Sequence, residues 1–246
     1  MSEHEMTDQE YQEILNSLIK KENNLLLFTK NDKKIFILGT IHHFHFTAND
    51  YSLAHVESVI KTVAPNVLLI EGRQATLSSH DAVDGPFEMA FARCIAREQG
   101  LPVFGIDSWE VIKDKAAFES LDALRDDRMF DNIIAASEGY CCALVLMGAS
   151  HRERMPERFL KAGYFAGKID NVLDYFSNIN TPFRYPNGMS AEFIRSCEYY
   201  KTGFLEEVNK SISPGDELYE MFEEMTKPGD DYDKKLEMIT KNNLFY

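Results

Sequence analysis

Four short apolar runs, each followed by a stretch with helical spacing, constrain the fold of this chain more than any other feature. They cover residues 34–38, 66–70, 101–106 and 142–147. Apolar residues follow one another within each run instead of alternating with polar ones, as in a strand that is buried on both faces. Strands of this kind joined by helices form a mainly parallel sheet with helices on both sides. The sequence therefore predicts an α/β fold.

The flanking segments complete the expected architecture. An apolar run at 24–29 is joined to the first core strand through Asn31 and Asp32, which favours an N-terminal hairpin. Helical spacing or composition predicts helices, with Gly100 and Gly139 as stops for the last two, at residues 9–20, 52–63, 87–99 and 110–137.

The chain changes character after Pro156, where several prolines interrupt an aromatic-rich sequence. We expect the part at about 156–246 to be a helical C-terminal region packed on the sheet. The core is expected at about 24–155, so that residues 1–246 form one α/β domain of ordinary size.

The charge balance limits the partners of this chain. It has 40 acidic and 26 basic side chains, a formal net charge of −14, and no Lys/Arg cluster of the kind that binds phosphates. We therefore expect neither nucleic acid nor a membrane as a partner, and a small molecule or peptide as substrate. No signal peptide or spanning segment is expected, and adjacent Cys141 and Cys142 in an apolar run favour reduced thiols and a cytoplasmic protein.

Side chains that can bind a metal or transfer a proton follow all four core strands. The carboxyl ends of parallel strands meet at one edge of a sheet, which is where ligands bind in such folds. Mixed imidazole and carboxylate donors suit a divalent transition metal such as Zn²⁺, Mn²⁺, Fe²⁺ or Co²⁺. We expect His42, Glu71 and His151 to be metal ligands. The full set along the chain is Gly39 with His42, Glu71, Asp107, and Gly148 with His151.

Several neighbours of these ligands have expected roles. Gly39 and Gly148 let the backbone turn sharply and let a cofactor approach closely. His45 would share a face with His42 if the loop there is helical, which makes it a second cofactor-binding candidate, whereas His43 would point elsewhere.

Charged residues around the ligands have structural as well as catalytic interpretations. Asp107 is either a further ligand or proton acceptor, or the N-cap of the following helix. Arg73 could pair with Glu71, and Arg73 or Arg125 could steady a carboxylate or a developing oxyanion.

A serine mechanism is an alternative interpretation of the second histidine segment. Gly148, Ala149 and Ser150 after a strand match the opening of the G-x-S-x-G nucleophile elbow. Arg152 stands where that motif requires its last glycine, so the motif fails there and Ser150 is better explained as the cap of the next helix.

Taken together, the segments G-T-I-H at 39–42 and G-A-S-H at 148–151, with Glu71 between them, resemble the TraB/Tiki/GumN family. That family belongs to the superfamily that also contains erythromycin esterase and the haem-binding protein ChaN. The segment R-D-D-R-M at 125–129 is similar to the family's R-D/N-x-x-M helix segment. The resemblance covers about half of the chain, residues 34–154.

The resemblance implies an α/β sheet fold and, as in the Tiki branch, a metal-dependent hydrolase acting on peptide or ester bonds. It carries over His42, Glu71 and His151 as metal or catalytic residues and Arg125 as a residue lining the site. Residues 152–154 depart from the family pattern, which continues with a small or apolar residue and a glycine. The ChaN resemblance implies an alternative, a non-catalytic haem-binding module with His43, His45 and Tyr51 as candidate axial ligands.

Overall fold

The computed structural model of the chain describes residues 20–46, 48–108, 121–180, 182–215, 219–220, 223–224 and 232–241. The four core strands are β2 (Lys33–Thr40), β3 (Val67–Arg73), β4 (Val103–Asp107) and β5 (Cys142–Gly148). They lie parallel, and β5 is inserted between β2 and β3. This arrangement confirms the mainly parallel α/β sheet.

Two antiparallel strands extend the sheet beyond β2. The hairpin expected around Asn31 is formed by β1 (Leu25–Lys30) and β2, with Asn31 in the left-handed conformation at φ 54°. The short strand β6 (Phe165–Ala166), which the sequence did not predict, pairs with the outer side of β1. The strand order is β4-β3-β5-β2-β1-β6.

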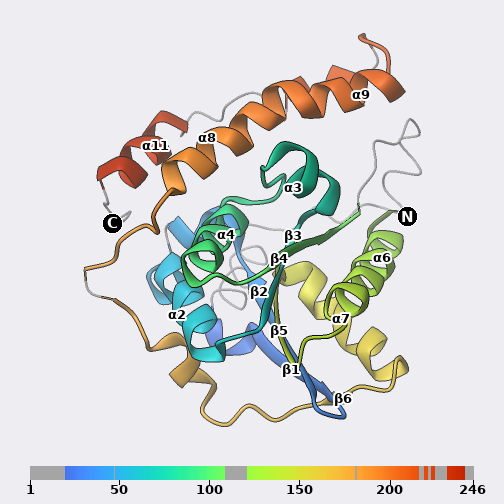
Figure 1. Ribbon diagram of the computed structural model, residues 1–246, viewed down its shortest axis with the longest axis vertical. Coiled ribbons are helices and arrows are strands. Elements are labelled where there is room, and N and C mark those ends of the chain that lie inside the picture. Colours follow the sequence, from blue (N-terminus) through green and yellow to red (C-terminus); the bar gives the residue numbers. More distant parts are fainter. Residues whose placement is uncertain are drawn as a thin grey trace, which may run out of the picture.

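Helices cover both faces of the sheet, because successive residues of each core strand point to opposite sides. On one side, α2 (Leu53–Val63) and α4 (Phe87–Gln99) pack on residues such as Leu38 and Ile70. On the other side, α6 (Leu121–Ala136) and α7 (Ala149–Lys161) pack on residues such as Ile37 and Leu69. Figure 1 shows the two helix pairs on either side of the strands.

Most predicted helix positions agree with the structure, with two differences. α4 has the predicted bounds, and its stop Gly100 is left-handed at φ 67°. α3 (Gln74–His80) was not predicted, and α7 continues through Pro156 to Lys161, so the expected start of the C-terminal region falls inside a helix. The helix predicted at 9–20, except for its last residue, and the first part of the one at 110–137 lie outside the described residues.

The C-terminal region is helical, as expected; its short strand β6 joins the sheet beside β1, and its helices pack on other helices. α8 (Met189–Tyr199) lies on α4, where Glu192 accepts a hydrogen bond from Arg93 at 2.6 Å. α8, the π-helical turn η5 (Tyr200–Phe204) and α9 (Leu205–Ser211) run across the top of the molecule, with α11 (Tyr232–Lys241) beside α8 (Figure 1). The 3-10 turns are η1 (Lys21–Asn23), η2 (His42–Phe46), η3 (Asn49–Tyr51) and η4 (Val172–Phe176).

In the described part of the chain, no helix has the length and apolar content needed to cross a bilayer.

Candidate functional site

The strand order brings the three candidate ligands to one place. Because β5 lies between β2 and β3, the segments that follow these three strands are neighbours, with Thr40 beside Gly148 and Ile70 beside Leu146 in the sheet. Glu71 lies at the centre, and its Oε1 is 3.7 Å from Nε2 of His151. We call Glu71, His42 and His151 the Glu71 cluster.

A β-bulge in β3 places Glu71. Ile70 pairs with Gly105 and Arg73 pairs with Asp107, so Glu71 and Gly72 together stand opposite the single residue Ile106. An extra residue of this kind bends a strand and re-aims its side chains. The bulge is closely packed, since a Cβ atom at Gly105 would lie 2.4 Å from the carbonyl oxygen of Gly72.

Glu71 is 5% exposed, and hydrogen bonds fix both of its carboxylate oxygens. Oε2 accepts the backbone N–H of Gly148 at 2.5 Å, and Oε1 accepts Nη2 of Arg125 at 3.1 Å. Arg125 is itself held by Asp107, which accepts its Nε at 2.8 Å and its Nη2 at 2.6 Å. Both oxygens of this buried carboxylate therefore have the hydrogen-bond donors that burial requires.

His42 lies directly after β2 with left-handed backbone at φ 51°, a conformation that is uncommon for a residue other than glycine. Its Nδ1 is 2.8 Å from Oε1 of Glu88, which is 1% exposed at the start of α4. Burial by itself would lower the pKa of His42, but the hydrogen bond and charge of Glu88, with the charge of Glu71, raise it. Burial would likewise raise the pKa of Glu88, and its bond to His42 contributes to lowering it.

His151 lies in the first turn of α7 and is 6% exposed. Its Nδ1 is 2.6 Å from Oδ1 of Asp126, a fully buried residue of α6. Arg154, one turn further along α7, also binds Asp126, through Nε to Oδ2 and through Nη2 to Oδ1 at 3.3 Å. Both histidines are therefore anchored at Nδ1 by a buried carboxylate.

Gly148 places no Cβ atom between His42 and Glu71, and we call this side-chain-free position the gap beside Gly148. A Cβ atom at this position would lie 2.8 Å from Nε2 of His42 and 3.4 Å from Oε2 of Glu71. Gly39 has a different role, because its Cβ atom would approach the Cα of Ala149 and the Nε of Arg152 at 3.2 and 3.1 Å. Gly39 therefore allows α7 to pack against β2, and only Gly148 borders the gap.

The other two histidines of the first segment lie apart from the cluster. His45 was expected to share a face with His42 if the loop is helical, and η2 is helical. His45 is nevertheless 2% exposed, and both of its ring nitrogens are hydrogen-bonded elsewhere. Nε2 accepts Ile41 N–H at 3.1 Å, and Nδ1 lies 2.8 Å from the carbonyl oxygen of Tyr51. His43 is exposed, and its ring lies tilted against that of Phe44 with ring centroids 3.9 Å apart.

The described contacts of Tyr51 and Ser150 do not connect these residues with the Glu71 cluster. The hydroxyl of Tyr51 donates to the carbonyl oxygen of Gly39 at 2.5 Å, and its ring is buried. Ser150 is exposed in the first turn of α7, and the described contacts include no hydrogen bond between its hydroxyl and a histidine. A haem ligand or a nucleophilic serine would require a different arrangement of these residues.

Arg73 does not pair with Glu71. Its guanidinium binds Asp84 at 2.5 Å and Glu207 at 2.7 Å, and it also donates to the hydroxyl of Tyr199. Asp84 additionally accepts the backbone N–H of Arg73 at 2.7 Å, so this pair fixes the end of β3. Arg125 is the arginine that contacts Glu71.

Sequence reasoning missed Glu88 and Asp126, the two residues that anchor the site histidines. Glu88 carries a weak signal, because a carboxylate stands within the apolar segment at 87–92 that covers the core. Asp126 lies in the R-D-D-R-M segment next to Arg125, yet only Arg125 was singled out.

The donor types of the Glu71 cluster fit a metal ion. Histidine ligands of metals commonly donate Nδ1–H to a carboxylate and bind with Nε2, and both histidines here have that carboxylate. The gap beside Gly148 borders Nε2 of His42 and the Glu71 carboxylate. Within the described ranges, however, no group of three or more His, Cys, Asp or Glu side chains is arranged to hold a metal ion. An ion would have to draw the imidazoles and Glu71 closer together.

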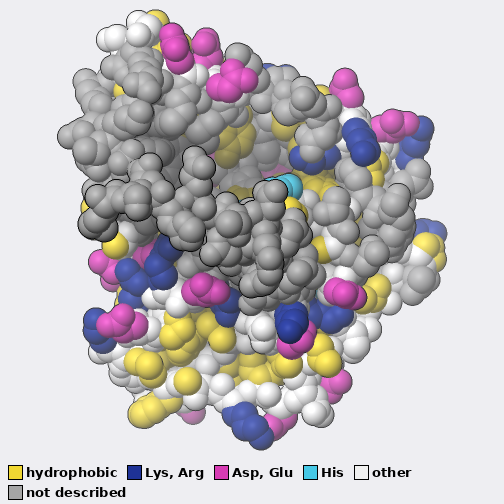
Figure 2. Space-filling view, turned by 180° about the vertical axis from the view of Figure 1, so that it is seen from behind, with side chains coloured by type: hydrophobic (Ala, Val, Ile, Leu, Met, Phe, Trp, Pro, Cys, Tyr) yellow, Lys and Arg dark blue, Asp and Glu magenta, His cyan; other side chains and the backbone are white. Residues whose placement is uncertain are grey.

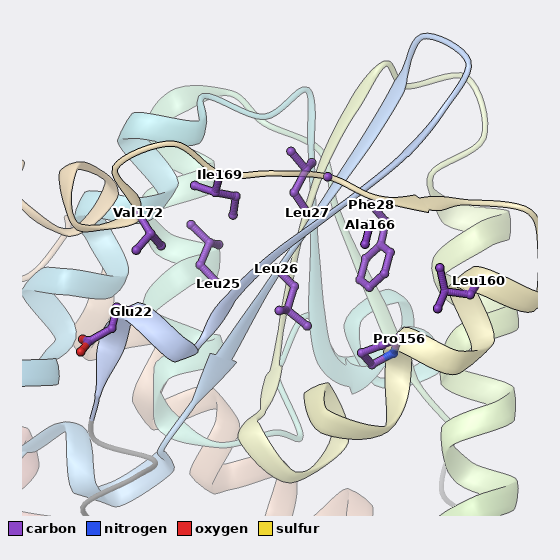
Figure 3. Close-up of a pocket in the computed structure, with 11 residues that line it drawn as sticks. Glu22, Leu25, Leu26, Leu27, Phe28, Pro156, Leu160, Ala166, Ile169 and Val172 are labelled. Carbon is purple, nitrogen blue, oxygen red and sulfur yellow. The ribbon is translucent and has the colours of Figure 1, made fainter.

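A separate pocket lies at the outer edge of the sheet. It has a volume of about 350 Å³ and lies between β1, α7 and the segment around Ile169 and Val172, as Figure 3 shows. Its lining is apolar apart from Glu22, and it contains no residue of the Glu71 cluster. On the face shown in Figure 2, a histidine side chain is visible inside a hollow of the surface.

Comparison of the chain with protein-family models, curated proteins and solved structures finds no match.

Proposed function

We propose that this chain is a metal-dependent hydrolase of peptide or ester bonds, with the Glu71 cluster as its active centre. One observation carries the proposal. The histidine that follows β2 and the one that follows β5 are each anchored at Nδ1 by a buried carboxylate, and both lie beside the buried carboxylate of Glu71. The resemblance to the TraB/Tiki/GumN family supports the same interpretation, and a cytoplasmic location accords with four free cysteines.

The chain's own residues supply distinct parts of such a reaction. Nε2 of His42 and of His151 would hold the ion, and Glu71 would either join them or accept a proton from the attacking water. A bound divalent ion would polarise the scissile carbonyl. It would also lower the pKa of its bound water, so that this water ionises near neutral pH. Arg125, 24% exposed, lies beside Glu71 and would stabilise negative charge that develops on the substrate.

Elemental analysis of the purified protein tests the proposal. We expect about one equivalent of a transition metal per chain, lost on chelation and restored by Mn²⁺, Co²⁺ or Zn²⁺ with a rise in Tm. His42→Ala and His151→Ala should each lose the metal. His43→Ala is the matched control, because His43 is the exposed neighbour of His42 and should retain the metal.

A metal-free protein whose Tm does not respond to these ions would contradict the metal-dependent function. Hydrolysis of fluorogenic peptides and aryl esters that survives chelation would contradict it as well. Labelling by a fluorophosphonate that is lost in Ser150→Ala would favour the serine mechanism instead.

A further inference from the structure

We propose that Glu88 and Asp126 are positioning residues that fix both site histidines in the Nδ1–H tautomer, so that each Nε2 presents a lone pair to the gap beside Gly148. This inference rests on the proposed function, because it explains how the histidines would be prepared to bind an ion. It adds two residues from helices α4 and α6 to a site that the strand ends alone suggested.

The distances assign the protons. A carboxylate without a proton only accepts hydrogen bonds, so Nδ1 of His151 must donate to reach Oδ1 of Asp126 at 2.6 Å. Nδ1 of His42 must likewise donate to Oε1 of Glu88 at 2.8 Å. In neutral imidazole a proton on Nδ1 leaves Nε2 as the acceptor, which is the atom that binds metals.

One contact favours the opposite assignment for His151, with the proton on Nε2. Nη2 of Arg154 lies 3.1 Å from Nδ1 of His151, and an arginine can only donate. If that contact dominated, Nδ1 would be the acceptor and the proton would lie on Nε2. Asp126 decides against this, because its oxygens already accept Arg154 and the shorter distance is the one between Nδ1 and Oδ1.

The two anchors differ in how completely they are satisfied. Both oxygens of Asp126 accept hydrogen bonds, from His151 and Arg154. In Glu88, Oε1 bonds to His42, while Oε2 is buried and accepts no hydrogen bond within the described part of the chain. The anchor of His151 is therefore the stiffer of the two, and its loss should change the tautomer most clearly.

Nitrogen NMR of the metal-free protein, with ¹⁵N-labelled histidine and at a pH where the rings are neutral, tests the proposal without any activity assay. We expect the Nδ1–H pattern for both rings in the wild type. In Asp126→Asn the amide can donate to Nδ1, so the His151 ring should change to the Nε2–H pattern. Co²⁺ affinity, read from its visible spectrum, should fall about tenfold or more.

Matched controls separate positioning from loss of charge. Asp127→Asn changes the next residue of α6, which binds Arg158 on the surface, and should leave the His151 pattern and Co²⁺ affinity unchanged. For Glu88→Gln, the control on α4 is Glu98→Gln, since Glu98 binds Asn187. Asp126→Glu keeps the acceptor and should retain the Nδ1–H pattern.

An Nε2–H pattern for either ring in the wild type would overturn the inference, and this measurement needs no variant to fold. An unchanged His151 ring in folded Asp126→Asn would overturn the role of Asp126. The proposed function fails on a different result, a protein that binds no ion although both rings show the Nδ1–H pattern.

Discussion

The two G-x-x-H segments are alike in sequence, yet their histidines have different surroundings in the structure. We call the His42 side of the Glu71 cluster the first wall and the His151 side the second wall. After β2, His42 lies on a 3-10 turn with left-handed backbone, and its side chain is 41% exposed. After β5, His151 lies in an α-helix, its side chain is 8% exposed, and its carboxylate anchor is also bound by Arg154. The first wall is open to solvent, and its histidine is held by the single carboxylate of Glu88. The second wall is buried, and its carboxylate Asp126 binds both His151 and Arg154.

The two histidines therefore suit different tasks, although both come from the same G-x-x-H motif. A rigid, buried imidazole holds a fixed position, and an imidazole at the solvent boundary is accessible to substrate and water. The predictions below test the comparison, starting with the largest expected effect.

Removing each histidine should have unequal effects on stability. His42→Ala leaves the buried carboxylate of Glu88 without its imidazole donor, and we expect a loss of about 3 kcal/mol in the free energy of unfolding. His151→Ala leaves Asp126 bound to Arg154, so the loss should be only about 1–2 kcal/mol. Urea denaturation at pH 7 measures both.

The double variant His42→Ala with Glu88→Gln is the control, because it removes the stranded charge and should recover part of the stability. Equal losses in the two single variants would show that the walls do not differ in this way.

Closing the gap between the walls should disable the site while leaving the fold intact. In Gly148→Ala the added methyl group would lie 2.8 Å from Nε2 of His42, so the ring must move. We expect Co²⁺ affinity and any hydrolytic rate to fall at least tenfold, about 1.4 kcal/mol or more. Gly100→Ala, at a left-handed position with open space around it, should lose stability only. Unchanged affinity in Gly148→Ala would place the gap outside the site.

His55, on α2 and outside the Glu71 cluster, makes the stability of the fold sensitive to acid. Burial and the nearby charge of Lys21 lower the pKa of His55 to about 4. In the unfolded chain this group titrates near about 6.5, so the unfolded state takes up the proton first. The contribution of His55 to stability is therefore present above pH 6.5 and is lost as the pH falls through about 4, a change of about 2 kcal/mol.

The free energy of unfolding measured from pH 7.5 to 4, in the wild type and in His55→Gln, isolates this effect. Glutamine keeps an acceptor for the backbone N–H of Ser52, which His55 binds at 3.0 Å. The difference between the two proteins should shrink as the pH falls. A constant difference would remove the acid sensitivity assigned to His55.

The sequence predicts the strand ends well because a simple rule governs them. Apolar runs identify buried parallel strands, and such strands deliver His42, Glu71 and His151 to one edge whatever the details of the helices. The hairpin at Asn31 and the stop of α4 at Gly100 follow equally local rules.

The partners of these residues could not be predicted, because they depend on how separate elements meet in space. Nothing in the local pattern indicates that Arg73 binds Asp84 and leaves Glu71 to Arg125. Glu88 and Asp126 lie on helices whose faces are set only once the sheet is covered. α7 continues past Pro156 because its packing on the sheet, through Met155 and Phe159, outweighs the single hydrogen bond that proline removes.

The bulge in β3 makes the number of residues at this point as important as their identity. Two residues of β3 occupy the length that one residue of β4 occupies, and Glu71 is the first of the two. Deleting Gly72 would keep every side chain of the cluster in the sequence and still turn Glu71 back into the ordinary alternation of the strand. A substitution scan would leave this dependence undetected, whereas insertions and deletions between Ile70 and Arg73 would reveal it.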